Sequence, residues 1–341
     1  MTLQAKLDAF KADFKGGKAP YFAPPDIHPI MERATAEMIA SGAAWTPSGL
    51  LTQYLSNRTE TDNPPTGRFI EVDGIPIHYL ERGAGMPVVL LHGNGTMAYE
   101  FEVSSLLGLA AEKYRVLAFD RPGYGYSGRP RGQAWTSKEQ ADLLFKALNA
   151  LGIDQAVIVG HSWGTMVATT LALEHPECVR SLVLLSGYYY PTPRVDVMLL
   201  SPPSIPGFGD VIRPTISPFI GRMLWPSLIQ KFFSPSPVTP RWHATFPKWM
   251  TLRPSQILAS AAETALMTVE AFWLAQRYHE LRMPVVIMAG TDDMHVSTSV
   301  HSEQLHHDIP HSQLVLVPGV GHMIHHVVPD QVLKAIDMAA S

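Results

Sequence analysis

From about residue 68 onward the chain alternates between short apolar runs and longer segments with helical spacing. Continuous apolar runs separated by helical segments predict a mostly parallel sheet covered by helices on both faces. A β-hairpin over residues 69–79, with its turn at Asp73-Gly74, precedes that sheet. The apolar runs are 87–91, 114–119, 156–159, 181–185, 284–289 and 313–317, and the helical patterns are about 98–112, 137–151, 164–175 and 329–340.

Residues 1–65 are predicted to form an N-terminal helical arm. Apolar residues recur at helical spacing over 3–14 and again over 29–39, and a proline-rich loop separates the two stretches. Such an apolar stripe has to pack on something. Packing on the body of the same chain is the simpler expectation, and a homodimer contact through the arm is the alternative.

One connection is far longer than a simple crossover between strands. The segment between Gly187 and Met283 is rich in proline and in large aromatic residues. An insertion of this length has structure of its own and is often a lid. We therefore expect a helical cap over residues 191–281, inserted after the sixth strand, and a core formed by residues 66–190 and 282–341.

Composition narrows the class of protein further. The net charge of −4 does not indicate a protein that binds nucleic acid, since such proteins are typically basic. The only cysteine, Cys178, excludes an intrachain disulfide and is expected to be a buried apolar side chain. We see no signal pattern and no uninterrupted apolar stretch that would span a bilayer, so the sequence predicts a cytoplasmic protein with no membrane span.

The pentapeptide Gly160-His161-Ser162-Trp163-Gly164 directly follows the apolar run 156–159. A strand, a tight Gly-x-Ser-x-Gly turn and a helix in this order form a nucleophile elbow. A serine needs a base to take its proton and an acid to orient that base. Later strand ends supply both in the order expected: Asp292 and Asp293 follow the run 284–289, and His322 follows the run 313–317.

Together these segments resemble the α/β-hydrolase family from about residue 68 to the C-terminus. The resemblance rests on the elbow and on four further motifs: 92–95 (HGNG), 120–127 (DRPGYGYS), 290–293 (GTDD) and 319–322 (GVGH). It implies an α/β-hydrolase fold in which Ser162 is the nucleophile, His322 the general base and Asp293 the orienting acid. Asp292 is the rival for the acid. The backbone amides of Asn94 and Trp163 are implied as the oxyanion hole.

The remaining histidines suggest a metal only weakly. His325 and His326 are rivals for His322, and we expect them to face solvent or the lid. They and the pair His306-His307 have no cysteine or carboxylate at ligand spacing in the sequence. We therefore predict no metal and no cofactor, and we interpret His92 and His161 as structural.

Asn94 and Trp163 also resemble the haloalkane dehalogenase branch, in which the nucleophile is an aspartate and the Asn and Trp side chains hold halide. A serine at position 162 favours acyl transfer instead. The sequence therefore predicts an esterase for a small, largely apolar substrate, with Met97, Tyr188 and Tyr189 in the pocket wall. The alternatives are C–C bond, amide or perhydrolysis chemistry with the same triad, or a ligand-binding protein with slow turnover.

Overall fold

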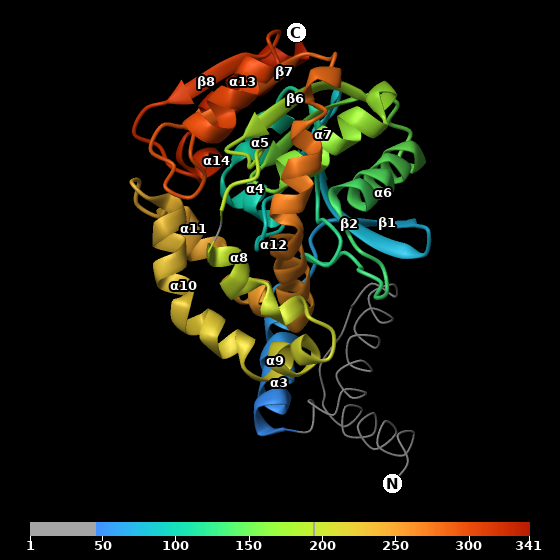
Figure 1. The fold of residues 1–341 in the computed structure, drawn as a ribbon. Helices are drawn as coiled ribbons and strands as arrows, with labels where there is room; N and C mark the ends of the chain where they lie inside the picture. Colours follow the sequence, from blue (N-terminus) through green and yellow to red (C-terminus); the bar gives the residue numbers. More distant parts are fainter. Residues whose placement is uncertain (1–45, 194) are drawn as a thin grey trace. The chain divides into compact units, whose positions relative to one another are not determined.

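The computed structural model describes residues 46–193 and 195–341, which contain an eight-stranded sheet (Figure 1). The strand order is β1-β2-β4-β3-β5-β6-β7-β8, with antiparallel pairing at β1, β2 and β4 and parallel pairing from β4 to β8. This confirms the predicted fold class. The strands are β1 Arg68–Val72, β2 Ile75–Arg82, β3 Pro87–Leu91, β4 Arg115–Phe119, β5 Ala156–His161, β6 Val179–Leu185, β7 Val285–Gly290 and β8 Gln313–Val317.

The predicted hairpin forms between β1 and β2. Val72 pairs with Ile75, which leaves Asp73 and Gly74 as a two-residue loop. Their φ angles are 52° and 74°, the left-handed values that a type I′ turn needs. The Asp-Gly pair therefore fixes the register of the first two strands.

Two separate hydrophobic cores lie on the two faces of the sheet, because successive side chains of a strand point to opposite faces. Ile158 of β5 packs in the core with α6 (Ser137–Ala150) and α7 (Gly164–Glu174). Its neighbours Val157 and Val159 pack in the other core, with α5 (Leu106–Ala111) and α15 (Pro329–Ala340). Burial on both faces is why these strands are apolar throughout.

The helix expected over about 98–112 is in fact two helices, so that prediction was wrong in detail. The first is α4 (Tyr99–Val103), and α5 begins at Leu106. Ser105 between them has a φ of 70°, and the Ser104 hydroxyl accepts the N–H of Leu106 at 3.3 Å. A left-handed residue and a serine that binds nearby backbone both interrupt a helix.

The insertion between β6 and β7 is helical, as predicted. It follows the sixth strand, and Figure 1 shows its helices below the sheet, with α12 running from this group up to α7. The helices are α8 Val195–Leu200, α9 Phe208–Thr215, α10 Ser217–Phe233, α11 Pro240–Thr245 and α12 Pro254–Ala275, and α13 Gln304–Asp308 and α14 Ile324–Val327 follow later in the chain.

From the sequence we predicted no apolar segment long enough to span a membrane, but helix α12 is such a segment. By length and composition it could cross a bilayer. However, Glu263 at its middle is fully buried and forms an ion pair with Arg121, which follows β4. A buried, paired carboxylate is typical of a helix packed into a folded domain.

Within the predicted arm, the structure describes the helix α3 (Pro47–Asp62). Thr46 caps it by accepting the N–H of Gly49 at 3.1 Å, and Glu60 pairs with Arg253 at 2.7 Å. The apolar stripes over 3–14 and 29–39, and any homodimer contact through them, lie outside the described residues. Cys178 is buried, as predicted.

Candidate active site

The turn between β5 and α7 holds Ser162 in a left-handed conformation, with a φ of 52°. Two glycines make this bend possible. A Cβ atom on Gly160 would lie 2.6 Å from the carbonyl oxygen of Gly164, and one on Gly164 would lie 2.4 Å from that of Leu91. Only glycine fits at both positions. The strain at Ser162, of order 1–3 kcal/mol for such a residue, is the cost of presenting its hydroxyl at the end of the sheet.

Three side chains predicted from separate strand ends meet at this turn. His322, which follows β8, lies with its Nε2 atom 3.0 Å from Ser162 Oγ. Its Nδ1 atom lies 2.8 Å from Asp293 Oδ2, and Asp293 follows β7. With Nδ1 protonated toward the carboxylate, Nε2 is free to accept the serine proton. The arrangement can therefore activate an oxygen nucleophile.

The environment of Asp293 keeps its carboxylate charged. The side chain is buried, and its Oδ1 atom accepts the backbone N–H groups of His295 at 2.8 Å and Val296 at 2.9 Å. Burial raises the pKa of Asp293, but His322 and the two N–H donors lower it by more, so it lies below its usual range. The ionised carboxylate can then hold His322 in one tautomer.

The rival carboxylate, Asp292, points elsewhere. It is exposed, and its Oδ2 atom accepts the Thr291 hydroxyl at 2.7 Å and the N–H of Gly319 at 2.9 Å. The structure thus brings Asp293, and not Asp292, into hydrogen-bonding distance of His322.

The loop after β3 packs directly against the elbow. A Cβ atom on Gly93 would lie 3.1 Å from Ser162 Cβ, which shows how closely the two backbones approach. Arg121 binds the carbonyl oxygens of His92 and Gly93, each at 2.9 Å. Since C=O and N–H point in opposite directions across a trans peptide, the amide of Asn94 points away from Arg121.

Arg121 is itself held by a buried polar network with the cap. Its guanidinium pairs with Glu263, whose carboxylate also accepts the Tyr124 hydroxyl at 2.6 Å and the Gln140 amide at 3.0 Å. Burial lowers the pKa of Arg121, but Glu263 raises it by more. The sequence alone did not identify Glu263 as the partner of Arg121. A carboxylate at the middle of a mostly apolar helix was the available signal.

Trp163 and Asn94 have side-chain N–H groups that could bind an anion near Ser162. Both side chains donate hydrogen bonds to helix α12 instead. Trp163 Nε1 donates to the carbonyl oxygen of Glu263 at 3.3 Å. Asn94 Nδ2 donates to the Thr264 hydroxyl at 2.9 Å and to the carbonyl oxygen of Ser260 at 3.2 Å. Both side-chain N–H groups are therefore used inside the protein.

The histidines around the triad are buried. His325 and His326 were expected to face solvent or the lid. Neither faces solvent, because α14 turns both rings into the interior, but His326 packs against Phe233 of the cap helix α10. His161 donates its Nε2–H to the carbonyl oxygen of His322, 3.0 Å away. Burial, with Arg121 nearby, lowers the pKa of His92 to about 4, and its Nε2 atom accepts the N–H of Arg121.

The three side chains predicted for the pocket wall are all buried. Met97 packs with cap residues such as Phe233 and Trp242. Tyr189 packs edge-on against Tyr278, and the Tyr188 hydroxyl binds the backbone of Thr192. That these three contact substrate stays a prediction.

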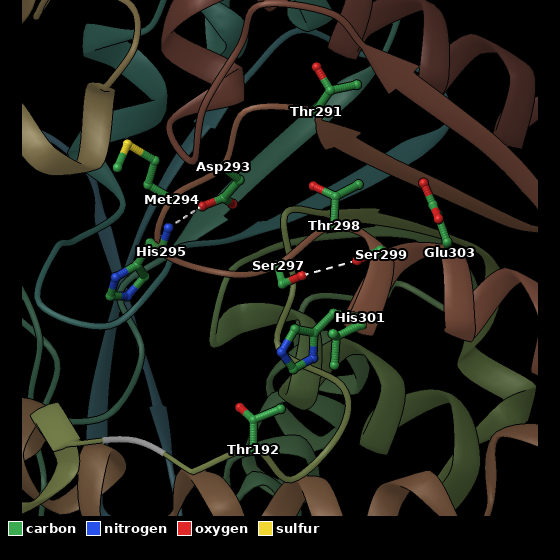
Figure 2. A pocket seen from close by; sticks show the side chains of 11 residues that line it. Thr192, Thr291, Asp293, Met294, His295, Ser297, Thr298, Ser299, His301 and Glu303 are labelled. Carbon is green, nitrogen blue, oxygen red and sulfur yellow. Dashed lines mark hydrogen bonds between the residues drawn. The ribbon is translucent and has the colours of Figure 1, made fainter.

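A cavity of about 480 Å³ adjoins the acid end of the triad (Figure 2). Asp293 contributes to its wall, together with Thr192 and a run of mostly polar residues over 291–303. Neither Ser162 nor His322 lines this cavity. It therefore lies beside Asp293 and does not include the serine or the histidine of the triad.

Comparison with known proteins agrees with this geometry. The family described as the alpha/beta hydrolase fold matches residues 86–329. The chain belongs to the α/β-hydrolase fold family. The match includes the elbow and the segments that carry Asp293 and His322, and the protein is a hydrolase of this fold.

Relatives of this α/β-hydrolase differ in their reactions. Haloalkane dehalogenase 2 of Mycobacterium tuberculosis is 26% identical over 268 residues, which cover 76% of this chain and 90% of that protein. The 2-hydroxymuconate semialdehyde hydrolase of a Pseudomonas species is 37% identical over 127 residues, 37% of this chain and 45% of that protein. The solved esterase of Thermogutta terrifontis has a TM-score of 0.59 at 22% identity and covers 80% of this chain and 97% of its own, which shows the shared fold.

Proposed function

We propose that this hydrolase cleaves a carboxylic ester of a small, largely apolar substrate through an acyl-enzyme intermediate. The observation that carries the proposal is the continuous chain from Ser162 Oγ to His322, at 3.0 Å, and from His322 to Asp293, at 2.8 Å. A serine in this arrangement attacks a carbonyl carbon, because its alkoxide is a good acyl acceptor and a poor leaving group from an alkyl carbon.

The proposed steps are supported by the hydrogen bonds that link Ser162, His322 and Asp293. His322 Nε2 takes the Ser162 proton as Oγ attacks the ester carbonyl, and the backbone amides of Asn94 and Trp163 stabilise the oxyanion. His322 then gives that proton to the departing alcohol. A water molecule, deprotonated by His322, attacks the acyl-enzyme; the bond between the acyl carbon and Ser162 Oγ breaks, His322 returns the proton to Oγ, and the acid product leaves. Asp293 stabilises the imidazolium at each stage.

The same site argues against dehalogenation, although a dehalogenase is among the relatives. A serine ether formed from an alkyl halide could not be hydrolysed as an ester is. In addition, the side-chain N–H groups of Asn94 and Trp163, which that branch uses for halide, bind helix α12 here. In this proposal the backbone amides of Asn94 and Trp163, and not their side chains, bind the oxyanion.

Hydrolysis of a C–C bond is the second candidate function. It is favoured by the 37% identity over 127 residues with 2-hydroxymuconate semialdehyde hydrolase. We rank it second because that similarity covers 45% of the relative's length.

A fluorophosphonate probe and a substrate panel test both proposals. The probe is expected to add once, on Ser162, and peptide mapping locates it. The wild type is expected to hydrolyse short p-nitrophenyl esters faster than ring-fission dienes or aminoacyl anilides, and Ser162→Ala to lose about 10³-fold or more in rate. Faster turnover of the dienes would favour C–C hydrolysis. Folded protein that takes no probe would reject an activated serine.

A further inference from the structure

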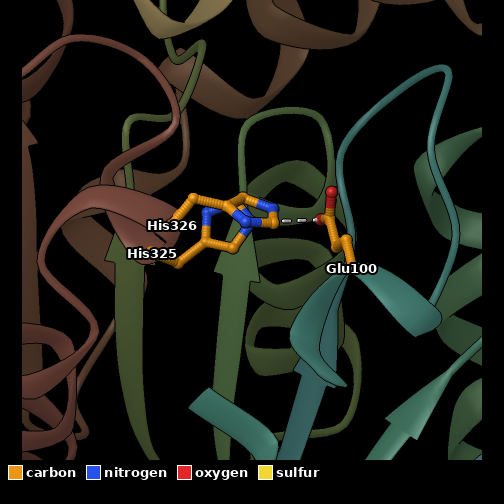
Figure 3. Close-up of side chains that lie close together, drawn as sticks. All are labelled: Glu100, His325 and His326. Carbon is orange, nitrogen blue, oxygen red and sulfur yellow. Dashed lines mark ion pairs between the residues drawn. The ribbon is translucent and has the colours of Figure 1, made fainter. Parts of the chain in front are cut away.

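Behind the triad lies a closed cluster of polar side chains that the proposed reaction does not use. Figure 3 shows Glu100 of α4 facing His325 and His326 of α14. All three residues are at most 5% exposed. Their ligand atoms lie within 4.8 Å of one another, and His161, from the end of β5, faces the same carboxylate.

The cluster leaves its polar atoms without hydrogen-bond partners. Thr96 donates to one oxygen of Glu100 at 2.7 Å, whereas the other oxygen, Oε1, has none. Among the described residues, neither ring nitrogen of His325 or His326 has a hydrogen-bond partner, and His161 Nδ1 has none. A buried polar atom without a hydrogen bond costs about 1–3 kcal/mol, so this cluster calls for a partner that accepts one lone pair from each side chain.

The spacing suits a metal ion. Glu100 Oε1 lies 3.6 Å from His325 Nε2 and 3.8 Å from His161 Nδ1. Two ligands at bond lengths of about 2.1 Å from a tetrahedral zinc ion lie about 3.4 Å apart. The separation between Glu100 and His325 exceeds hydrogen-bond length but needs to close only slightly around an ion, and the donor of His326 lies within 4.8 Å of both.

The protonation states agree with metal binding. Burial, with the neighbouring His325, lowers the pKa of His161 and of His326 well below the usual histidine range. A neutral imidazole offers a lone pair to a metal.

We propose that Glu100, His325 and His326 bind a Zn²⁺ ion, which ties α4 to α14. His161 lies beside the site, with Nδ1 3.8 Å from Glu100 Oε1 and Nε2–H donated to the carbonyl oxygen of His322. The ion therefore braces the loop that carries the catalytic base. Its role is structural, and the proposal does not depend on which bond the hydrolase cleaves. It also revises the expectation from sequence that these histidines are simply packed or solvated.

Because the site is fully enclosed, the ion enters as the chain folds. The test therefore unfolds the protein with chelator, refolds it with and without ZnCl₂, and measures bound metal by mass spectrometry and the midpoint of thermal unfolding. We expect one zinc per chain and a higher midpoint in the zinc-refolded protein. Refolding with Co²⁺ is expected to give the visible absorption of a tetrahedral site.

Two conservative variants and one control complete the experiment. Glu100→Gln and His326→Asn keep side-chain size and are expected to weaken zinc binding by about 100-fold or more. An exposed histidine gives the matched control: His307→Ala is expected to bind zinc like the wild type. If the variants fail to fold, the number of zinc ions bound per wild-type chain tests the proposal by itself. A folded wild type that takes up no zinc, or uptake lost only in the control, overturns the proposal.

Discussion

The two adjacent carboxylates Asp292 and Asp293 have different partners, and that difference decides which one serves His322. Both follow β7, but the carboxylate of Asp293 is buried against the histidine, whereas Asp292 is exposed and binds Gly319. A substitution of Asp292 is therefore a matched control for the same substitution of Asp293.

We expect Asp293→Asn to lower kcat by about 10³- to 10⁴-fold, because an amide cannot stabilise the imidazolium or fix the tautomer of His322. Asp292→Asn is expected to keep most of the activity. Steady-state hydrolysis of a p-nitrophenyl ester by the two variants, with circular dichroism as a check on folding, measures this. Similar losses in both would contradict the assignment of Asp293.

A second residue-scale prediction concerns Asp120, which anchors the loop behind the elbow. It is buried, accepts the N–H groups of Ala98 at 2.8 Å and Tyr126 at 3.0 Å, and lies 2.7 Å from His78 Nδ1. Burial raises the pKa of Asp120, but His78, His92 and the N–H of Ala98 together lower it by more, so the pKa lies below its usual range in the folded protein.

A depressed pKa contributes stability above the unfolded value, and that stability is lost as the pH falls through the folded value. The free energy of unfolding should therefore decrease as the pH drops below about 4. Asp120→Asn is expected to be less stable than the wild type at pH 7 and to lose less on acidification. Guanidinium unfolding from about pH 6 to pH 3 measures both slopes. Equal slopes in the two proteins would reject the role of this carboxylate.

Among the elements, α12 connects the cap to the catalytic loops. Its Glu263 pairs with Arg121, and Arg121 in turn binds the carbonyl groups of His92 and Gly93. Removing one partner of a buried ion pair leaves the other charge uncompensated, at a typical cost of 3–5 kcal/mol. The helix therefore sets the geometry of the oxyanion loop as well as covering it.

Glu263→Gln is accordingly expected to destabilise the protein by about 3 kcal/mol and to lower kcat, since Arg121 no longer holds the loop firmly. The matched control is Glu280→Gln, which removes an exposed carboxylate that pairs with Arg277 at 3.0 Å. That change should leave the thermal midpoint and kcat close to the wild-type values. An unchanged midpoint in Glu263→Gln would show that the network contributes little to stability.

At the scale of the whole described region, the cap has two differently anchored parts. Helix α12 has buried residues along its length and the ion pair of Glu263 at its middle. Helix α10 buries only Pro218, Ile229 and Phe233, while apolar side chains such as Met223 are exposed. Local opening is cheapest where few apolar contacts are broken. If the cap admits substrate by moving, α8 to α10 are the part that moves.

Hydrogen exchange can check this division. Amides in the middle of α12 are expected to exchange much more slowly than those in α9 and α10, and a fluorophosphonate adduct on Ser162 should slow exchange in the mobile helices more than in α12. Exchange that is equally fast across α10 and α12 would show that the cap opens as one unit.

The local features of the fold could be predicted from the sequence because short-range physics determines them. Strand and helix positions follow from periodicity, the hairpin from Asp73-Gly74, and the α6 start from the capping box of Thr136 and Glu139. The elbow follows from Gly160 and Gly164, since only glycine fits there. The order of Ser162, Asp293 and His322 follows from parallel strands, whose carboxyl ends share one edge of the sheet.

Contacts between distant parts of the chain were decided by the tertiary structure alone. No sequence spacing places Glu263 against Arg121, or Glu100 beside His325 and His326. A search for a carboxylate near the paired histidines in sequence missed Glu100 because the sheet brings α4 and α14 together across more than two hundred residues. Burial then changes the chemistry, since polar atoms that are inexpensive in water need partners once they are enclosed.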